Sequence, residues 1–435
     1  MVRAQAQALG ANHGAMPSIV ILSGNHLCHN PRVIKEAIAL AQSGFDVEVL
    51  GAWLDASLKA RDLDLVARLP FRFTPVIDLA ETNSATQIQR LVCRLLNKAG
   101  QLAYGIGRLP NRWQLGYAIG ALARAARQRR ADLFIAHSEP ALMVAQDLLD
   151  SGRRVGVDME DWFSEDLLPE ARRHRPIGLL RDLEGKLLRQ GAHATCPSQA
   201  MSEALARTYG CSPPAVIYNA FAWADRDSID GRIEDRRTRQ ISSIHWYSQT
   251  IGRGRGLEDL LAALPYVKHE VEIHLRGVPV LGFGDWLSAR VPQKWRHRVF
   301  VHGLVSNDEL LSRISEHDIG FAGEMKFSAS RELTITNKIL HYLLAGLAVV
   351  ASDTAGQQEV AKRAQGAVLL YPSGDAPALA AQIDRLLESP ELLKKTKANA
   401  LLAAKQTFCW EQQQKVLLGS VVRAAGAPDR YIEAL

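Results

Sequence analysis

The chain has 435 residues, of which 47% are hydrophobic and 23% charged, and its formal net charge is +6. This composition is ordinary for a globular protein, and at ~150 residues per domain the length predicts two or three domains. No run approaches the ~18 consecutive apolar residues of a membrane-spanning helix, and residues 1–17, which lack the apolar segment of a secretory signal, are expected to form a flexible tail. Five cysteines without a Cys-x-x-Cys pair indicate reduced thiols in a cytoplasm.

In chain order, the first pattern is a strand, a loop, a helix and a second strand. Residues 18–23 form an apolar run, Asn30 and Pro31 are suited to begin a helix, and residues 45–50 form the next strand. Such a unit opens a doubly wound parallel sheet. His26, in the loop, is placed where it can face a cleft at the carboxyl end of the first strand. No further ligand cluster of suitable spacing accompanies it, so a metal site is not expected.

Segment 81–130 is strongly basic. It holds nine lysines and arginines against one acid, a net charge of +8, and its apolar residues alternate with the cations at roughly helical spacing. Such a stretch can lie on an anionic membrane surface, where each cation contributes ~1 kcal/mol. It can equally be a solvated helix pair whose apolar side packs on its own domain. Nucleic acid is a third interpretation, but no accompanying motif supports it, and we expect no nucleic-acid partner.

Two polar clusters follow strands in the next part of the chain. A strand over residues 132–136 ends at His137, and one over residues 155–157 leads into an acidic stretch that includes Asp161. Both clusters come after strand carboxyl ends, where open α/β sheets bind ligands. A histidine at such a position is often structural, with its hydrogen bonds made within the protein, but His137 is accompanied by acidic residues at the same sheet edge. The first domain is expected to close at residue 218.

A second series of strands and helices follows a polar connection over residues 223–240, which we expect to be exposed. It opens with a strand over residues 241–247 and a turn that contains Arg253, Gly254 and Arg255. The glycines of this turn allow close backbone approach and the arginines supply fixed positive charge, so the turn indicates an anion site. Its spacing is neither that of a dinucleotide-binding Gly-x-Gly-x-x-Gly motif nor that of a Walker loop.

The stretch 331–358 predicts a polar loop, a helix over residues 337–345 that stops at Gly346, and a further strand. The free N–H groups and the positive dipole end of such a helix attract anions, and Lys338 in its first turn adds a charge. The alternative is an ordinary strand, turn and helix that binds nothing. Together with the arginine-bearing turn, the pattern predicts an anion site in the second domain.

The order of these motifs resembles that of the retaining GT-B glycosyltransferases of the large family four, of the bacterial polysaccharide and lipopolysaccharide type. The resemblance runs from about residue 18 to residue 418, and the run NKILHYLLAGLAVVASD carries its most specific part. It implies an α/β protein with two Rossmann-like, doubly wound parallel-sheet domains facing a cleft. Residues 18–218 would bind the acceptor and residues 219–400 the nucleotide sugar. Residues 401–435 would form a helix that crosses back to the first domain.

The resemblance also implies roles for individual residues. Arg255 occupies the place of the family's diphosphate-binding lysine, whereas the family's nearby arginine falls on Thr250, so that contact is absent unless Arg253 substitutes. Glu332 resembles the first of two paired glutamates that face the donor, and His341 stands where the second usually binds the nucleotide ribose. The predicted sets are catalytic Glu332 and His137, donor-binding Arg253, Gly254, Arg255, Asn337, Lys338 and His341, and acceptor-side His26 and Asp161.

The chemistry of glycosyl transfer also requires positive charge near the diphosphate. Breaking a glycosyl–phosphate bond leaves negative charge on the diphosphate, which fixed cations and N–H groups stabilise. No aspartate cluster suggests a magnesium site, so we expect metal-independent transfer, with a nucleotide-sugar donor and no cofactor. Glu332 is a candidate for a covalent nucleophile, but the resemblance favours front-face attack, with Glu332 and His137 orienting sugar hydroxyls.

We therefore expect a cytoplasmic glycosyltransferase, peripheral on the inner face of the cell membrane. It would move a sugar, with retention, from a nucleotide sugar to a glycan or lipid-linked acceptor in bacterial surface polysaccharide synthesis. A nucleotide-sugar epimerase shares the two-domain architecture and remains a rival. A noncatalytic nucleotide- or glycan-binding protein is a second rival, which His341 keeps open.

Overall fold

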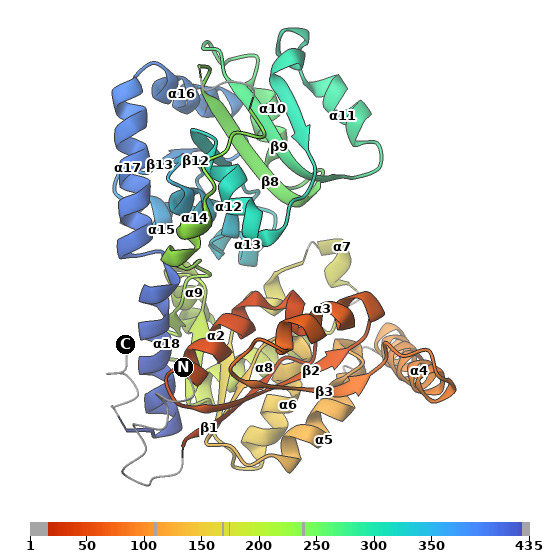
Figure 1. Cartoon of the computed structure of the whole chain (residues 1–435). Coiled ribbons are helices and arrows are strands. Elements are labelled where there is room, and N and C mark those ends of the chain that lie inside the picture. Colours follow the sequence, from red (N-terminus) through yellow and green to blue (C-terminus); the bar gives the residue numbers. More distant parts are fainter. Residues whose placement is uncertain (1–15, 108–110, 168, 174, 237–239, 429–435) are drawn as a thin grey trace. The chain divides into compact units, whose positions relative to one another are not determined.

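The computed structural model describes residues 16–107, 111–167, 169–173, 175–236 and 240–428 (Figure 1). Contacts divide the chain into two compact units: unit 1 is residues 1–196, 202–217 and 414–435, and unit 2 is residues 197–201 and 218–413. The predicted domain boundary lies after residue 218, and the predicted last segment starts at 401, before the return to unit 1 at 414. Most of the predicted tail, all but residues 16 and 17, lies outside the described residues.

Unit 1 is built on a parallel sheet of seven strands in the order β3-β2-β1-β4-β5-β6-β7. Ile19 of the central strand pairs with Val47 on one side and Leu133 on the other. The chain therefore reverses its winding between β1 and β4, and ligands bind near such switch points. The strands are β1 (Ser18–Leu22), β2 (Asp46–Trp53), β3 (Arg72–Asp78), β4 (Leu133–Ala136), β5 (Val155–Asp158), β6 (His193–Cys196) and β7 (Ala215–Val216).

Helices cover both faces of this sheet, which explains why strands such as β1 are apolar throughout. The first helix begins as predicted, because the side chain of Asn30 accepts a hydrogen bond from the Val33 N–H. The helices are α2 (Pro31–Gln42), α3 (Ala56–Val66), α4 (Ser84–Gly107), α5 (Ile119–Gln128), α6 (Glu139–Asp150), α7 (Pro169–Arg172) and α8 (Ile177–Gln190). Two more, α9 (Gln199–Tyr209) and α18 (Trp410–Ala425), have residues in both units. Short 3-10 turns are η1 (Leu27–His29), η2 (Arg112–Leu115) and η3 (Phe163–Glu165).

Unit 2 repeats the architecture with a parallel sheet of six strands in the order β10-β9-β8-β11-β12-β13. Its strands are β8 (Ser243–Ile251), β9 (Glu272–Pro279), β10 (Val299–His302), β11 (Ile319–Ala322), β12 (Ala348–Ser352) and β13 (Val368–Tyr371). Its helices are α10 (Leu257–Ala263), α11 (Phe283–Arg290), α12 (Asn307–Ser315), α13 (Ala329–Leu333), α14 (Asn337–Ala345), α15 (Ala355–Arg363), α16 (Ala376–Leu387) and α17 (Pro390–Gln406). Two 3-10 turns are η4 (Trp223–Ser228) and η5 (Gln293–Arg298). The two sheets confirm the predicted fold class of two doubly wound parallel sheets.

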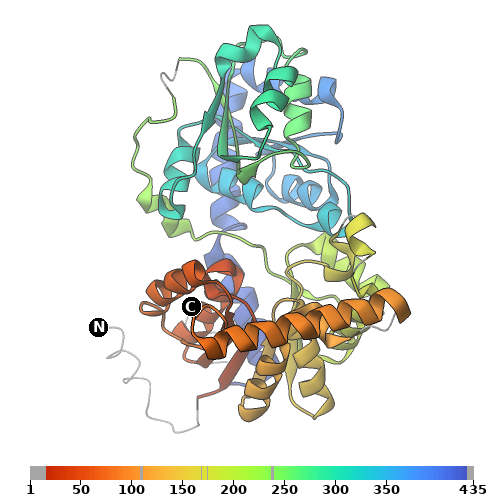
Figure 2. The same cartoon turned by 90° about the vertical axis from the view of Figure 1, so that its right-hand side faces the viewer.

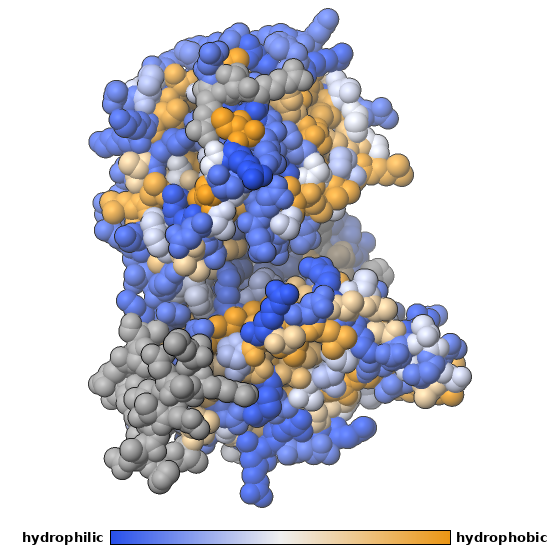
Figure 3. All heavy atoms as spheres, viewed as in Figure 1, coloured by the Kyte–Doolittle hydropathy of each residue, from blue (hydrophilic) through white to orange (hydrophobic). Residues whose placement is uncertain are grey.

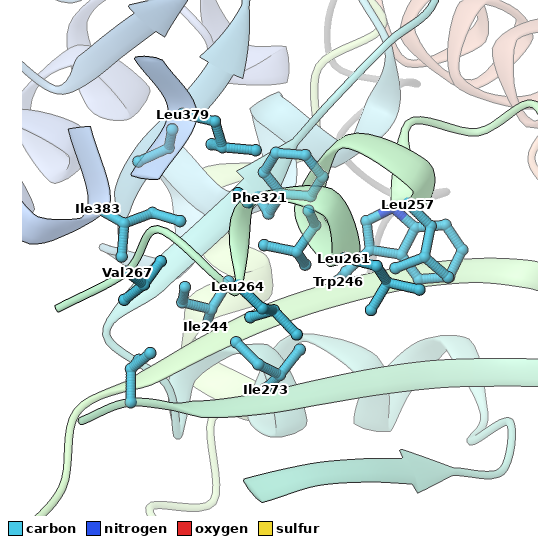
Figure 4. Packing of buried hydrophobic residues seen from close by; sticks show 14 of the residues in the cluster. Ile244, Trp246, Leu257, Leu261, Leu264, Val267, Ile273, Phe321, Leu379 and Ile383 are labelled. Atoms are coloured by element: carbon cyan, nitrogen blue, oxygen red, sulfur yellow. The ribbon is translucent and has the colours of Figure 1, made fainter. Parts of the chain in front are cut away.

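The core of unit 2 shows why its strands and helices pack as they do. Ile244 and Trp246 of β8 lie against Leu257 of α10 and Ile383 of α16 in one buried cluster (Figure 4). Side chains alternate along a strand, so the residues between them point to the other face. There the ring of His245 lies 6.0 Å from that of Tyr342 on α14.

Three local predictions need correction. The strand predicted over residues 241–247 continues to Ile251, because β8 keeps pairing with β9 up to Pro279 after a register shift. The connection 223–240 is not exposed throughout: Arg236 is 5% exposed and donates to Asp318 at 3.0 Å. Edge strand β3 was not predicted.

The basic segment 81–130 contains two helices with opposite surroundings. Helix α5 buries Ile119, Leu122, Ala123 and Ala126 against unit 1, as a helix packed on its own domain does. Helix α4, in contrast, lies at the edge of unit 1 and exposes most of its apolar residues (Figure 2). Within the described part of the chain no helix has the length and apolarity that crossing a bilayer requires.

Candidate active site

The turn from β8 to α10 holds backbone conformations that favour glycine. Gly254 and Gly256 have φ angles of 77° and 76°. A Cβ atom on Gly256 would lie 2.2 Å from the carbonyl oxygen of Gly323, which follows β11. The turn therefore lies directly against the loop after β11, at the carboxyl edge of the unit 2 sheet.

The charges of this turn come from side chains rather than from a helix end. Arg253 and Arg255 are exposed, and Nη1 of Arg255 donates to Oγ of Ser248 at 2.9 Å. The N–H of Gly254 donates to Oε1 of Glu258, in the first turn of α10, at 2.7 Å. Because this carboxylate already occupies the start of α10, an anion here would be held by the arginines.

Helix α14 offers an anion a more favourable start. Its first turn has no acid, and its N-cap residue Thr336 makes no capping hydrogen bond; the Thr336 hydroxyl is buried without a hydrogen-bond partner among the described residues. Nζ of Lys338 lies 2.7 Å from Oε1 of Glu324. Oδ1 of Asn337 accepts a hydrogen bond from Nδ2 of Asn219 at 3.0 Å. The start of α14 thus combines backbone N–H groups, the Thr336 hydroxyl and Lys338, whose charge is paired with Glu324.

Glu332 lies at the same edge, on α13. Its Oε1 accepts a hydrogen bond from the Ala355 N–H at 3.2 Å, and its Oε2 is buried without a hydrogen-bond partner among the described residues. Nζ of Lys326 lies 3.9 Å from Glu332 and 3.0 Å from Asp353. Lys326 and Glu324 were not predicted from the sequence. Their position just after the apolar strand β11, at its carboxyl end, was the signal that could have identified them.

His341 is fixed by two aromatic neighbours. Its Nδ1 lies 2.5 Å from the hydroxyl of Tyr247, and its ring stacks on that of Phe221 with centroids 3.4 Å apart. Burial raises the pKa of Tyr247 above its ordinary value, so this phenol keeps its proton, and its hydroxyl shares a hydrogen bond with Nδ1 of His341. In place of a carboxylate, this position therefore holds an imidazole fixed between Tyr247 and Phe221.

His137 follows β4, but its side chain is fully buried. Its Nε2 lies 2.6 Å from Glu36 and its Nδ1 2.7 Å from Glu160. Burial alone would lower the pKa of His137, yet these carboxylates hold the pKa well above its ordinary value. Arg32 pairs in turn with Asp158 at 2.6 and 3.1 Å. His137 is therefore a buried cation among acids, and its contact with a sugar hydroxyl stays a prediction.

A pocket of about 400 Å³ opens at the carboxyl edge of the unit 1 sheet, directly beside this cluster in sequence. It is lined by Ser138, whose φ of 76° is unusual for a residue with a side chain, and by Glu139 and Pro140. Strained backbone of this kind is often found at binding sites. The other lining residues are Gly24, Asn25, Leu54, Leu115, Gly116, Tyr117, Ala118 and Phe163. Unit 1 thus offers a concave surface where an acceptor was predicted.

The two acceptor-side predictions differ in their surroundings. His26 is buried: its Nδ1 lies 3.0 Å from Asp62, and its Nε2 accepts hydrogen bonds from the N–H groups of Leu54 and Asp55 at 2.7 and 3.0 Å. His26 thus joins a carboxylate within α3 to the backbone of the loop that precedes this helix. Asp161 is partly exposed, after β5. An acceptor contact by either residue stays a prediction.

Two groups of described residues bring three potential metal ligands within 4.8 Å of one another: Glu36, His137 and Asp158, and Asp235, His245 and His317. In the first group, Nε2 of His137 lies 2.6 Å from Glu36 and Arg32 donates to Asp158 at 2.6 Å, so ion pairs engage all three residues. In the second, Arg276 donates to both carboxylate oxygens of Asp235 and neutralises it. Both groups are thus engaged in ion pairs within the protein, and metal independence stays a prediction.

Two family models match separate parts of the chain. The family described as Glycosyltransferase Family 4 matches residues 32–221, and the family described as Glycosyl transferases group 1 matches residues 246–389. The first match lies within unit 1 apart from residues 197–201 and 218–221, and the second lies within unit 2. A search of curated protein sequences gives no match.

Several solved structures share the fold over almost their whole length. Sucrose-phosphate synthase from Thermosynechococcus elongatus has a TM-score of 0.68 at 16% identity, covering 94% of this chain and 98% of its own. HepE from Anabaena, solved with UDP, has a TM-score of 0.63 at 17% identity, covering 93% and 99%. A UDP-forming trehalose-phosphate synthase from Burkholderia xenovorans has a TM-score of 0.65 at 12% identity, covering 93% and 99%. At these identities the likeness establishes the fold.

Proposed function

We propose that this protein, a glycosyltransferase of the GT-B type by its two family matches and its fold, moves a sugar from a nucleotide sugar to a glycan or lipid-linked acceptor. The observation that carries the proposal is the gathering of Arg255, Lys338 and the acid-free start of α14 at one sheet edge. A diphosphate leaving group gains negative charge as the glycosyl bond breaks, and preorganised cations and N–H groups stabilise that charge. HepE, which shares the fold, is solved with UDP and with UDP-glucose.

The acceptor side of the proposal relies on unit 1. The pocket beside Ser138 mixes apolar and polar lining residues, as sites for small polar ligands do. We assign the protein to bacterial surface polysaccharide synthesis, in the cytoplasm at the inner face of the membrane. The exposed, acid-free helix α4 supports the membrane part of this assignment.

For the chemistry we propose metal-independent transfer with retention. The Ala355 N–H holds Oε1 of Glu332, and Oε2 is buried without a hydrogen-bond partner among the described residues, so the carboxylate retains hydrogen-bonding capacity for a sugar hydroxyl. A carboxylate positioned in this way can stabilise the charge that develops on the reacting sugar. The nucleophile is the acceptor hydroxyl, and its proton goes to the departing phosphate oxygen.

Nucleotide affinity tests the donor site. Arg255→Ala and Lys338→Ala should each weaken the binding of the nucleoside diphosphate that the wild type prefers by roughly 10- to 150-fold, since charge-assisted hydrogen bonds contribute ~1.5–3 kcal/mol. Calorimetric titration with a panel of nucleoside diphosphates measures this. Lys394→Ala, an exposed cation of α17, is the matched control and should bind normally. Unchanged affinity in both site variants would overturn the assignment.

Product analysis separates the proposal from its rivals. A transferase releases free nucleoside diphosphate and lengthens an acceptor, whereas an epimerase returns an isomeric nucleotide sugar. Nucleotide binding without turnover for any donor would favour a noncatalytic protein. His341 keeps this last rival in the test, because the family's usual residue at this position is a glutamate.

A further inference from the structure

Helix α4 meets the rest of unit 1 through polar and small residues. Arg90 donates to two backbone carbonyl oxygens of the preceding loop at 2.5 and 2.9 Å, and Nδ2 of Asn97 donates to a carbonyl oxygen of η2 at 2.8 Å. Thr86 and Gly100 are its buried residues. A Cβ atom on Gly100 would lie 2.5 Å from Oδ1 of Asn111, so this face of the helix is in close contact with η2.

The opposite face of α4 is apolar and exposed. Positions three, four and seven residues apart recur on one side of a helix, and six large apolar side chains follow that spacing here. They are exposed by 47% to 81%, and we call them the outer stripe: Ile88, Leu91, Val92, Leu95, Leu102 and Ile106. A surface helix ordinarily turns such a stripe toward its own core. Helix α4 does the reverse, with polar residues inside and apolar residues outside.

The charge of α4 has one sign. Its 24 residues include no aspartate or glutamate, while Arg94 and Lys98 are exposed one turn apart and make no ion pair among the described residues. In Figure 3, orange and blue spheres lie side by side where α4 projects from unit 1. Two copies of this helix facing each other would bring like charges together without an acid on α4 to pair them. An anionic surface complements both the stripe and its cations.

We propose that α4 docks unit 1 on an anionic lipid bilayer, with the outer stripe among the acyl chains and Arg94 and Lys98 in the headgroup layer. The helix lies parallel to the bilayer, because it is ~36 Å long and apolar along one side only. This inference rests on the proposed function. If the protein is a glycosyltransferase, docking of α4 implies that the acceptor is a lipid resident in the bilayer rather than a free glycan. Within the basic segment 81–130, the proposal limits the membrane-binding surface to one face of α4.

Vesicle flotation tests the proposal. The full chain should float with vesicles of phosphatidylglycerol and phosphatidylcholine, less so with phosphatidylcholine alone, and less as salt shortens the Debye length from ~8 Å at physiological ionic strength. Leu91→Gln/Leu95→Gln/Leu102→Gln should lower the partition coefficient by ~10-fold or more, since it removes three of the six apolar side chains that would enter the bilayer. Arg94→Gln/Lys98→Gln should lower it by about 30-fold at low salt, since each cation near the surface contributes a factor of about five.

The matched controls make the same types of substitution at exposed residues of unit 2, away from α4. Leu281→Gln/Leu304→Gln/Leu402→Gln changes three leucines of unit 2 that are at least 53% exposed, and Lys394→Gln/Lys395→Gln removes two exposed cations of α17. Both should float like the wild type. Leu95→Trp should show a blue-shifted emission that brominated lipid quenches, as expected if the stripe enters the acyl region.

Nucleoside diphosphate titration of the same samples separates the two proposals. Stripe variants should keep the wild-type nucleotide affinity, so loss of flotation alone concerns α4 and loss of nucleotide binding alone concerns the donor site. A wild type that binds nucleotide but ignores anionic vesicles at low salt overturns docking. So does a concentration-dependent dimer, seen by light scattering without lipid, that the stripe variant abolishes.

Discussion

Among single residues, Glu332 gives the sharpest test of the proposed chemistry. Glu332→Gln keeps the shape of the side chain and a carbonyl oxygen for the Ala355 N–H, but it removes the negative charge. We expect turnover to fall by ~10²-fold or more with donor affinity almost unchanged, because a charge aimed at the reacting sugar acts mainly in the transition state. Steady-state kinetics of sugar transfer with the preferred donor measures both quantities. Glu391→Gln, in the first turn of α17, is the control, and equal activity of the two variants would return Glu332 to a structural role.

The buried cluster around His137 predicts a pH dependence. Glu36 and Glu160 hold the pKa of His137 well above its unfolded value of ~6.5, although burial opposes them. A raised pKa in the folded state means that the stabilisation is complete below pH ~6.5 and is lost as the pH rises through the folded value. Asp158, Arg32 and His193 also adjoin the cluster.

Thermal unfolding from pH ~6.5 upward should therefore show the midpoint of unit 1 declining. The double variant Glu36→Gln/His137→Gln removes the histidine and its main partner, and its decline should be smaller. Imidazole proton shifts in an NMR titration would report the raised pKa of His137 directly. Equal declines in both proteins would mean that another group controls the stability of unit 1 over this range.

The sequence pointed to charged candidate residues at strand ends, but it could not assign their contacts. Arg255 and Lys338 were found because glycine turns and helix starts mark strand ends in the sequence. His26 was proposed as an acceptor contact, yet its nitrogens meet Asp62 and backbone N–H groups of a helix that was not predicted. The closure of His137 by Glu36 likewise joins residues about a hundred positions apart, which no local pattern reveals.

At the scale of elements, the sequence predicted those helix ends that neighbouring residues determine and missed the strands that depend on distant pairing. Helix α14 has the predicted bounds, since Gly346, with φ of 81°, ends it. Strand β3 was missed because it includes Pro75 and is only half-buried along most of its length, features that its position at the sheet edge allows. The end of β8 was missed because its polar residues pair with β9, far along the chain.

The turn between β8 and α10 allows a matched pair of substitutions. Gly254→Ala and Gly256→Ala both force a side chain to φ near 76°, which costs ~1–2 kcal/mol. At Gly256 the new Cβ would also lie 2.2 Å from a backbone oxygen, whereas at Gly254 nothing lies within 4 Å. We expect Gly256→Ala to destabilise unit 2 by at least ~3 kcal/mol and Gly254→Ala by ~1 kcal/mol. Urea unfolding followed by circular dichroism measures the difference, and similar costs would contradict the close approach of the turn to Gly323.

At the scale of the whole molecule, the chain combines two sheets that each have their own helices and core. Strand order and direction follow one scheme in both, so the fold class could be predicted from alternating strand and helix patterns alone. The two units differ in what their carboxyl edges present. Unit 2 presents arginines, lysine and an open helix start, while unit 1 presents a pocket and a histidine closed in by acids.

This division predicts where ligand binding stabilises the protein. If Arg255 and Lys338 hold a nucleoside diphosphate, the ligand binds folded unit 2, and at a hundred times Kd it adds ~2.7 kcal/mol to the stability of whatever unfolds together with the site. Amides of unit 2 that exchange hydrogen by unfolding should then slow by ~100-fold, while those of β1, β4 and β5 in unit 1 keep their rates. Hydrogen exchange followed by mass spectrometry measures both sets in one sample, and Lys338→Ala at the same nucleotide concentration should show a much smaller slowing. Equal slowing in the two units would mean that they unfold as one, and slowing in unit 1 alone would place the nucleotide on the wrong sheet.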